Sequence, residues 1–176
     1  MISDPRVRRE RDTPLAYLFT FRSYGTWLHG DERGSTDRFH NRYQTPHLSP
    51  SEVRHSHDRR LLKGKPFLLD ARQRRSVEWA LREVCDHRRW ALHAINVRTN
   101  HIHLVIGIGD GSAGRALNDR KAYATRRLRR DGLWRAAHSP WADRGSKRYL
   151  WSHRSLALAV DYVINGQGDE LVDLTE

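Results

Sequence analysis

Two histidines separated by one residue, His101 and His103, are the strongest sign of chemistry in this sequence. They lie in the stretch Thr-Asn-His-Ile-His-Leu-Val-Ile, whose alternating apolar residues predict a β-strand. Successive strand residues point to opposite faces, so both imidazoles should share one face and Ile102 and Leu104 the other. Neighbouring imidazoles on a rigid element suit a divalent metal ion. The alternative is two polar residues on a half-exposed strand, because short motifs often arise without a function.

Tyr123 follows in a very basic run, Arg-Lys-Ala-Tyr-Ala-Thr-Arg-Arg-Leu-Arg-Arg. On a helix, Leu117, Ala124 and Leu128 form an apolar stripe, and Tyr123 lies at its polar edge. Arginines around a phenol favour the phenolate and can hold a phosphate group. A metal-ligand pair followed by such a tyrosine is what phosphodiester cleavage through a tyrosyl ester needs. The alternative is a tyrosine that flanks the core, with the arginines on a solvated face.

Composition predicts one domain, residues 1–176, with a polyanionic partner. Lys and Arg number 32 against 21 Asp and Glu, a net charge of +11. Nucleic acid is the commonest partner of such a chain, although a ribosome-associated or membrane-surface protein would share this balance. The single cysteine, Cys85, excludes an intramolecular disulfide and falls at core spacing. The sequence has neither an apolar stretch of membrane-spanning length nor a signal peptide, so we expect a cytoplasmic protein without a membrane partner.

The elements that must position these residues follow from periodicity and from capping residues. Strands are expected at 15–24, 90–97, 101–108 and 146–152, and helices at 70–87, 112–130 and 155–165. This order predicts an α+β, ferredoxin-like split βαβ fold, an antiparallel sheet with packed helices, in which the histidine strand is central. Residues 1–13 are expected to form a mobile arm and residues 25–66 a long insertion after the first strand.

At this point the residues resemble a known family. His101-Ile102-His103 resembles the histidine–hydrophobic–histidine signature of HUH endonucleases. Tyr123 resembles the nucleophile of their single-tyrosine branch, the transposases of REP-associated and simple insertion-sequence type. The resemblance also covers residues 17–24, Trp27-Leu28-His29-Gly30-Asp31 and the closing Tyr162-Val163 helix.

The resemblance implies a transposase-type endonuclease that nicks and rejoins single-stranded, hairpin-flanked DNA through a 5′-phosphotyrosine intermediate. It implies Tyr123 as the nucleophile, and His101 and His103 as ligands of Mg²⁺ or Mn²⁺. The enzyme is expected to work as a monomer or homodimer. Cations of the same helix are the expected DNA contacts, namely Lys121, Arg126, Arg127 and Arg130.

The third metal ligand departs from the family pattern. Relatives often place a glutamine one helical turn after the tyrosine, but here that position is Arg127, which cannot bind a cation. One turn before the tyrosine stands Asp119, whose carboxylate suits Mg²⁺ and which we expect to be the third ligand. The alternative is an ion pair of Asp119 with Arg126 or Arg130. The weaker candidates are His29, His40 and His93.

Three other functions fit part of the pattern. Histidine-triad hydrolases need a third histidine where this chain has Val105. Two-histidine phosphoesterases need a second His-x-Ser or His-x-Thr on an apolar strand, and His153-Arg154-Ser155 lacks such a strand. The main alternative is a non-catalytic nucleic-acid-binding module derived from a transposase, which would keep the basic surface without the cleavage.

Overall fold

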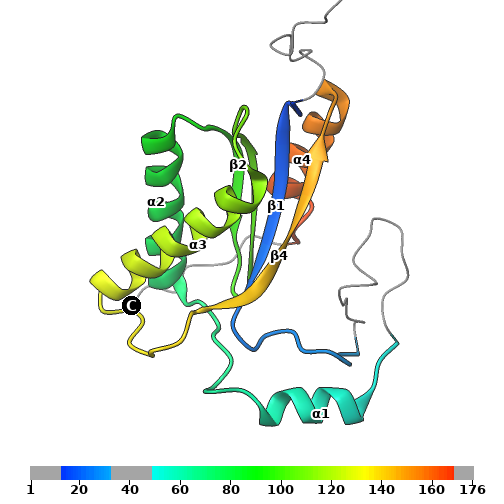
Figure 1. Cartoon of the computed structure of the whole chain (residues 1–176), viewed down its shortest axis with the longest axis vertical. Coiled ribbons are helices and arrows are strands. Elements are labelled where there is room, and N and C mark those ends of the chain that lie inside the picture. Colours follow the sequence, from blue (N-terminus) through cyan, green and yellow to red (C-terminus); the bar gives the residue numbers. More distant parts are fainter. Residues whose placement is uncertain (1–12, 33–48, 169–176) are drawn as a thin grey trace, which may run out of the picture.

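Four antiparallel strands form one sheet in the order β2-β3-β1-β4 (Figure 1). The computed structural model describes residues 13–32 and 49–168. The strands are β1 (Ala16–Ser23), β2 (Ala91–Val97), β3 (His101–Gly107) and β4 (Trp141–Leu150). This is the predicted ferredoxin-like fold, an α+β arrangement with an antiparallel sheet and packed helices, and its histidine strand β3 is central as expected.

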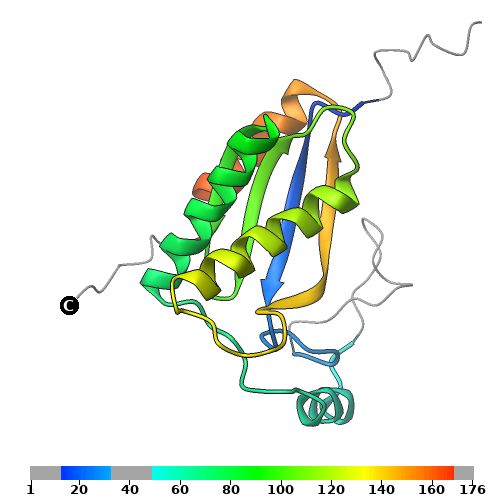
Figure 2. The same cartoon turned by 60° about the vertical axis from the view of Figure 1, so that its left-hand side comes forward.

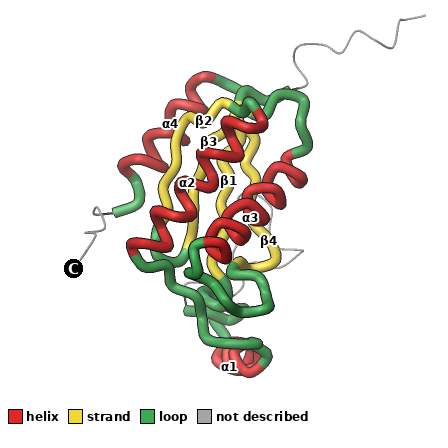
Figure 3. The backbone as a smooth tube through the Cα atoms, turned by 90° about the vertical axis from the view of Figure 1, so that its left-hand side faces the viewer, coloured by secondary structure: helices red, strands yellow, loops and turns green. Residues whose placement is uncertain are grey.

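Helices cover both faces of this sheet. The helices of the described residues are α1 (Glu52–Arg60), α2 (Ala71–Arg88), α3 (Ala113–Arg130) and α4 (His153–Asn165), and all but α1 pack on the sheet. Helices α2 and α3 lie side by side over one face, and α4 lies behind the opposite face (Figures 2 and 3). Helix α1 belongs to the connection between β1 and α2 and lies away from the sheet (Figure 1).

Local signals explain where these helices begin. Asp70 caps α2 in a capping box with Gln73, in which each side chain accepts a hydrogen bond from the other residue's backbone. Ser112 accepts from the Arg115 amide at the start of α3, and Ser152 caps α4. The boundaries expected from the sequence therefore agree with the structure within a few residues.

The apolar side chains form two clusters, one on each face of the sheet. Under α2 and α3, the alternate strand residues Phe19, Ile102 and Leu104 are fully buried, and Cys85 lies in the same core as predicted. A smaller cluster on the opposite face joins Val105 of β3 to α4. Because the sheet separates these clusters, each strand residue belongs to the α2–α3 side or to the α4 side.

Two regions differ from the expectation. Strand β4 begins at Trp141, five residues before the expected start at residue 146, because its first half pairs with β1 despite a polar, glycine-containing sequence. The connection 25–66 contains the helix α1, which the sequence did not predict. The expected arm lies almost wholly outside the described residues, as does the middle of this connection. No helix of the described part is long and apolar enough to cross a membrane.

Arg120 on α3 is a buried cation inside the α2–α3 core. The side chain is 0% exposed, and its guanidinium carbon lies 3.7 Å from the centre of the Phe19 ring. None of its three side-chain nitrogens has a hydrogen-bond partner among the described residues. Burial lowers the pKa of Arg120 to about 10, so the group is still charged at neutral pH.

We expect Arg120→Met to stabilise the protein, because methionine fills similar space without a buried, unpaired charge. Apolar replacement of buried charged groups is often neutral or stabilising by about 1–4 kcal/mol, and a gain of that order raises the melting temperature by several degrees in a chain of this size. Thermal unfolding followed by circular dichroism measures the change. A lower melting temperature would mean that stacking on Phe19 outweighs the desolvation of the charge.

Candidate active site

His101 and His103 share the α4 face of the sheet. Strand alternation turns Ile102 and Leu104 into the α2–α3 core and leaves the two imidazoles on the opposite side, beside Val105. The ring centroids lie 4.7 Å apart. His103 is 6% exposed and His101 is half-buried, so most of the surface of the two imidazoles is covered by neighbouring residues.

Each imidazole is oriented by a partner at its Nδ1 atom. His103 Nδ1 lies 2.7 Å from the hydroxyl of Thr20, its cross-strand neighbour on β1. His101 Nδ1 lies 2.7 Å from Oδ1 of Asn100, and an N–H at this position donates to that oxygen. A proton on each Nδ1 leaves the lone pair on Nε2, which is how histidines are held when they bind a metal.

Both imidazoles are neutral at pH 7. Burial lowers the pKa of His103 to about 4, with a further contribution from the neighbouring His101 and from Arg22. Burial also lowers the pKa of His101, and Arg22 again adds to the shift. Neutral imidazole is the form that binds cations, so the site is ready for a metal without first losing protons.

Gln167 follows α4 and returns its side chain to the histidines. Its amide nitrogen donates to the Tyr162 carbonyl oxygen at 3.1 Å, which directs its Oε1 toward His101 Nε2, 3.3 Å away. Two ligand atoms about 2.1 Å from one octahedral cation lie roughly 3 Å apart, so this separation suits a shared metal. The turn depends on Gly166, where a Cβ would lie 2.8 Å from the Tyr162 carbonyl oxygen.

The donor set is therefore two imidazole nitrogens and one amide oxygen. Among the described residues, no third His, Cys, Asp or Glu side chain joins the pair, and Gln167 is the ligand candidate because its oxygen lies beside Nε2 of His101. A mixed nitrogen and oxygen set fits Mn²⁺ at least as well as Mg²⁺. The remaining coordination positions would be open to a substrate oxygen or to water.

Tyr162 on α4 packs against His103. Its ring centroid is 5.4 Å from that of His103, with the ring planes at 71°. The side chain is 44% exposed, so a phenol at this position borders both the histidines and the solvent. Tyr162 and Gln167 come from one short segment, and they contact His103 and His101 respectively.

Cations flank this face of the sheet. Arg22 of β1 is the cross-strand neighbour of His101, and its guanidinium carbon lies 3.0 Å from the centre of the Trp27 ring. Arg148 of the edge strand β4 pairs with Leu18, which places its side chain on the α4 side as well. This charge favours a phosphate-containing substrate over a cationic one.

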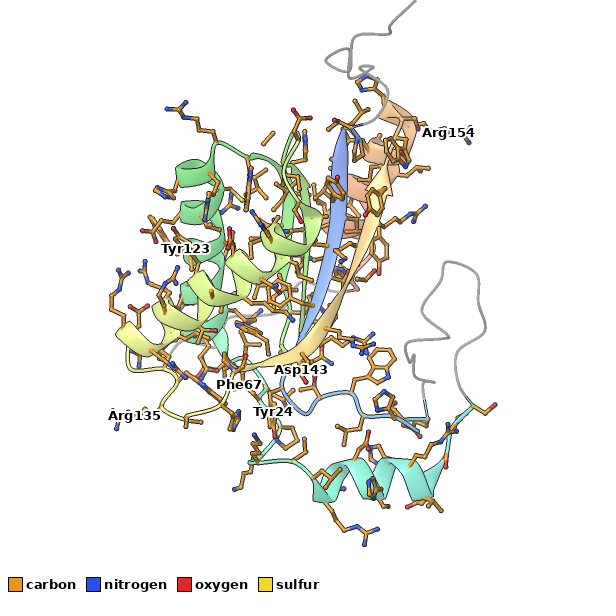
Figure 4. The ribbon with its side chains drawn as sticks, viewed as in Figure 1. Tyr24, Phe67, Tyr123, Arg135, Asp143 and Arg154 are labelled. Carbon is orange, nitrogen blue, oxygen red and sulfur yellow. The ribbon has the colours of Figure 1, made fainter. Side chains whose placement is uncertain are left out.

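Tyr123 is not part of this arrangement. It lies on α3, over the opposite face of the sheet, where Figure 4 shows it on the far side of the strands from α4. Its neighbours are His87, with ring centroids 6.4 Å apart, and Arg126, whose guanidinium carbon lies 4.4 Å from the ring centre. The sheet separates its phenol from the histidines, so the expected nucleophile and the expected metal ligands do not meet within one chain.

Asp119 also lies on the α2–α3 side of the sheet, opposite the face that carries the two histidines. Its carboxylate pairs with Arg88 of α2 at 3.0 Å. An ion pair was the expected alternative for Asp119, but its partner is Arg88 and not Arg126 or Arg130. The weaker candidate His29 pairs with Asp58 at 2.8 Å, and His40 lies outside the described residues.

The cations expected to contact DNA have different surroundings. Arg127 pairs with Asp131 at 2.8 Å, and Arg130 lies 3.6 Å from the same carboxyl group. Arg126 is exposed beside Tyr123. Lys121 is buried, and its ammonium donates to the carbonyl oxygens of residues 142, 143 and 144 at 2.7, 3.2 and 3.0 Å. Lys121 therefore holds β4 in place, which corrects its assignment as a DNA contact.

Lys121→Met should destabilise the protein, in contrast with the same change at the adjacent Arg120. The substitution leaves three carbonyl groups without their donor, and a buried unpaired polar group costs about 1–3 kcal/mol. Chemical denaturation of the two variants side by side measures whether each substitution raises or lowers the free energy of unfolding. Equal stability of Lys121→Met and the wild type would mean that water replaces the ammonium.

The order of the predicted elements could have identified Tyr162, which was not among the expected site residues. In a split βαβ unit the two crossover helices cover one face, so an additional closing helix has only the other face to cover. That face is the one to which His101 and His103 point once Ile102 and Leu104 are assigned to the core. A tyrosine on the closing helix is therefore nearer to the histidines than one on a crossover helix.

Comparisons with known proteins find a likeness among solved structures. No protein-family model and no curated protein matches the sequence. A solved structure described as a REP-associated tyrosine transposase bound to a REP hairpin is similar in fold, with a TM-score of 0.49 and 16% identity over 92% of this chain and 70% of that chain. At this level the likeness does not establish a family for the protein.

Proposed function

We propose that this protein nicks and rejoins single-stranded DNA through a covalent tyrosine intermediate, with Tyr162 as the nucleophile. The observation that carries the proposal is the convergence of Tyr162, Gln167 and two neutral imidazoles on one face of the sheet. The resemblance of His101-Ile102-His103 to HUH endonucleases supports the same reaction class. Tyr162 replaces Tyr123 in this proposal, and Gln167 replaces Asp119.

His101, His103 and Gln167 would hold Mg²⁺ or Mn²⁺, and a bound ion would withdraw charge from the non-bridging oxygens of a scissile phosphate. The Tyr162 phenol oxygen attacks the phosphorus, and the bond from phosphorus to the 3′ oxygen breaks. The phenol loses its proton, and the departing 3′ oxygen gains one. The protein is then joined to the 5′ phosphate, and attack by a free 3′-hydroxyl reverses the step and frees the tyrosine.

The test is the formation of a covalent adduct. Wild-type protein is incubated with a panel of end-labelled single-stranded hairpins and Mn²⁺, and the products are separated on a denaturing gel. We expect label at the 3′ end of the substrate, downstream of the cut, to migrate with the protein, and the adduct to disappear in excess chelator. Tight hairpin binding without any adduct across the panel would instead favour a non-catalytic nucleic-acid-binding module.

DNA binding should weaken steeply as salt is raised. Each phosphate contact contributes about −0.7 to the slope of log affinity against log salt for a single strand. We expect Arg148→Ala, on the histidine side of the sheet, to flatten this slope by about one contact. The matched control is Arg126→Ala on α3, which should leave the slope unchanged. If the control flattens it instead, DNA runs along α3.

A further inference from the structure

A groove of about 730 Å³ opens at the end of the sheet where β1 finishes. It lies between residues 63–67, which precede α2, and residues 134–138, which follow α3. Figure 4 shows Phe67 and Tyr24 at this end of the molecule. Sites that bind small organic groups have volumes of roughly 300–1,000 Å³, so the groove is large enough for a nucleotide.

A continuous series of aromatic rings includes three that line the groove, namely Phe67, Trp134 and His138. The centroid of Phe67 lies 4.5 Å from that of Trp134, which lies 5.2 Å from His138, which in turn lies 4.3 Å from Tyr24. Trp134 and His138 are partly exposed, so ring surface remains open to a ligand. Flat, open rings of this kind bind nucleobases by stacking.

Backbone and side-chain hydrogen bonds hold these rings in position. Trp134 Nε1 donates to the His138 carbonyl oxygen at 3.0 Å, which closes the 134–138 turn. The Phe67 amide donates to the Tyr24 carbonyl oxygen at 2.8 Å, and the Lys63 amide donates to the Tyr24 hydroxyl at 2.6 Å. A platform that is already ordered loses little conformational entropy when it binds a ligand.

The rim of the groove is cationic. Lys63 and Lys65 line it and are exposed, and no carboxylate is among the described residues that line it. Two ammonium groups beside a row of aromatic rings match a ligand that has a flat, apolar part next to a negative charge. A nucleotide has this combination, with its base and its phosphate.

The groove adjoins the strand ends that carry the candidate active site. Beyond Phe67, the Leu69 amide donates to the Thr99 carbonyl oxygen at 2.7 Å, and the Ser23 amide donates to the Asn100 carbonyl oxygen at 3.0 Å. Asn100 is the residue whose side chain orients His101. The wall of the groove is thus linked, through the turn before β3, to the histidine pair.

We propose that this groove binds an unpaired nucleotide of the DNA strand that the protein cleaves. The base stacks on the Trp134 ring and meets His138 edge to face, because the planes of these two rings lie at 76° to each other. The adjoining phosphate lies between Lys63 and Lys65. The occupant is part of a single strand because the groove is open and adjoins the candidate site for strand cleavage. This inference rests on the proposed function, since it names a second binding position for the same substrate.

The first experiment asks whether a base is recognised at Trp134. Binding of a hairpin with a single-stranded flank is measured by fluorescence anisotropy in chelator, which prevents cleavage, and compared with the same DNA made abasic in the flank. We expect the wild type to lose about tenfold in affinity for the abasic strand, and Trp134→Leu to bind both strands with that lower affinity. The matched control is Trp79→Leu, which removes a 65% exposed tryptophan from α2. Equal effects of the two substitutions, or equal binding of intact and abasic strands by the wild type, would overturn the proposal.

The second experiment uses exposed residues whose replacement leaves the packing intact. We expect Lys63→Ala/Lys65→Ala to weaken binding of intact and abasic strands by the same factor and to flatten the salt dependence by about one contact. The charge-matched control is Arg72→Ala/Arg82→Ala on the exposed side of α2, which should change neither. If the lysine variant behaved like this control, the proposal that a phosphate lies between Lys63 and Lys65 would be wrong. A free nucleoside monophosphate that binds as tightly as the strand would assign the groove to a small ligand instead.

The two proposals fail separately. An adduct in Mn²⁺ without base-dependent binding at Trp134 would refute the groove and leave the nuclease. Base-dependent binding at Trp134 without an adduct would refute the nuclease and leave the groove as part of a single-strand binding surface.

Discussion

Tyr162→Phe should abolish the covalent protein–DNA adduct, whereas Tyr123→Phe should form it at the wild-type level. The first substitution removes the phenol oxygen of the ring that packs against His103, and without this nucleophile no phosphotyrosine can form. The second removes the same atom from the opposite face of the sheet, where the ring lies near His87 and Arg126. Denaturing gels of labelled hairpin with each variant in Mn²⁺ measure the difference directly.

Hairpin binding in chelator is the control for folding of both variants, because loss of one hydroxyl group changes little packing. Both variants should therefore bind hairpin DNA with wild-type affinity in chelator. Peptide mapping of the wild-type adduct identifies the linked residue independently. Linkage to Tyr123 would mean that its helix serves the histidines of a second subunit, since one chain does not bring these residues together.

Mn²⁺ binding should depend on the residues of the α4 face and not on Asp119. We expect His103→Ala to reduce Mn²⁺ affinity below detection, since it removes one of three proposed ligands. Thr20→Val keeps the ligands but removes the hydroxyl that orients His103, and such outer partners typically contribute about 10- to 100-fold in affinity. Isothermal titration calorimetry of the DNA-free protein measures each effect without relying on cleavage.

The matched comparison for the third ligand is Gln167→Ala against Asp119→Ala. The first should weaken Mn²⁺ binding and the second should not, because the Asp119 carboxylate is paired with Arg88 across the sheet from the histidines. Thermal melts of all four variants establish that they are folded at the temperature of the titration. Mn²⁺ affinity that is unchanged in both His103→Ala and Gln167→Ala would remove the metal from the proposed mechanism.

Much of the fold could be predicted from the sequence because its signals are local. The capping box of Asp70 with Gln73 and the cap at Ser112 mark helix starts through contacts within one turn. The alternation around His101 and His103 fixes the two faces of β3. The first half of β4 lacked such a signal, because Gly145 and its polar neighbours are held in the sheet by pairing with the distant strand β1. Cross-strand pairing of this kind is a non-local interaction that a periodicity pattern does not record.

The sequence by itself determined that two imidazoles share one face of a central strand, since this follows from the two-residue period of a β-strand. It also determined that Tyr123 and Tyr162 each lie on an amphipathic helix. Only the tertiary structure decided which of these helices lies over the histidines. An amphipathic pattern tells which side of a helix is buried but not which face of a sheet receives it, because that depends on how α2, α3 and α4 divide the two apolar faces among them. The same packing decided that Gln167, which follows α4, reaches His101, while Asp119 on α3 pairs with Arg88.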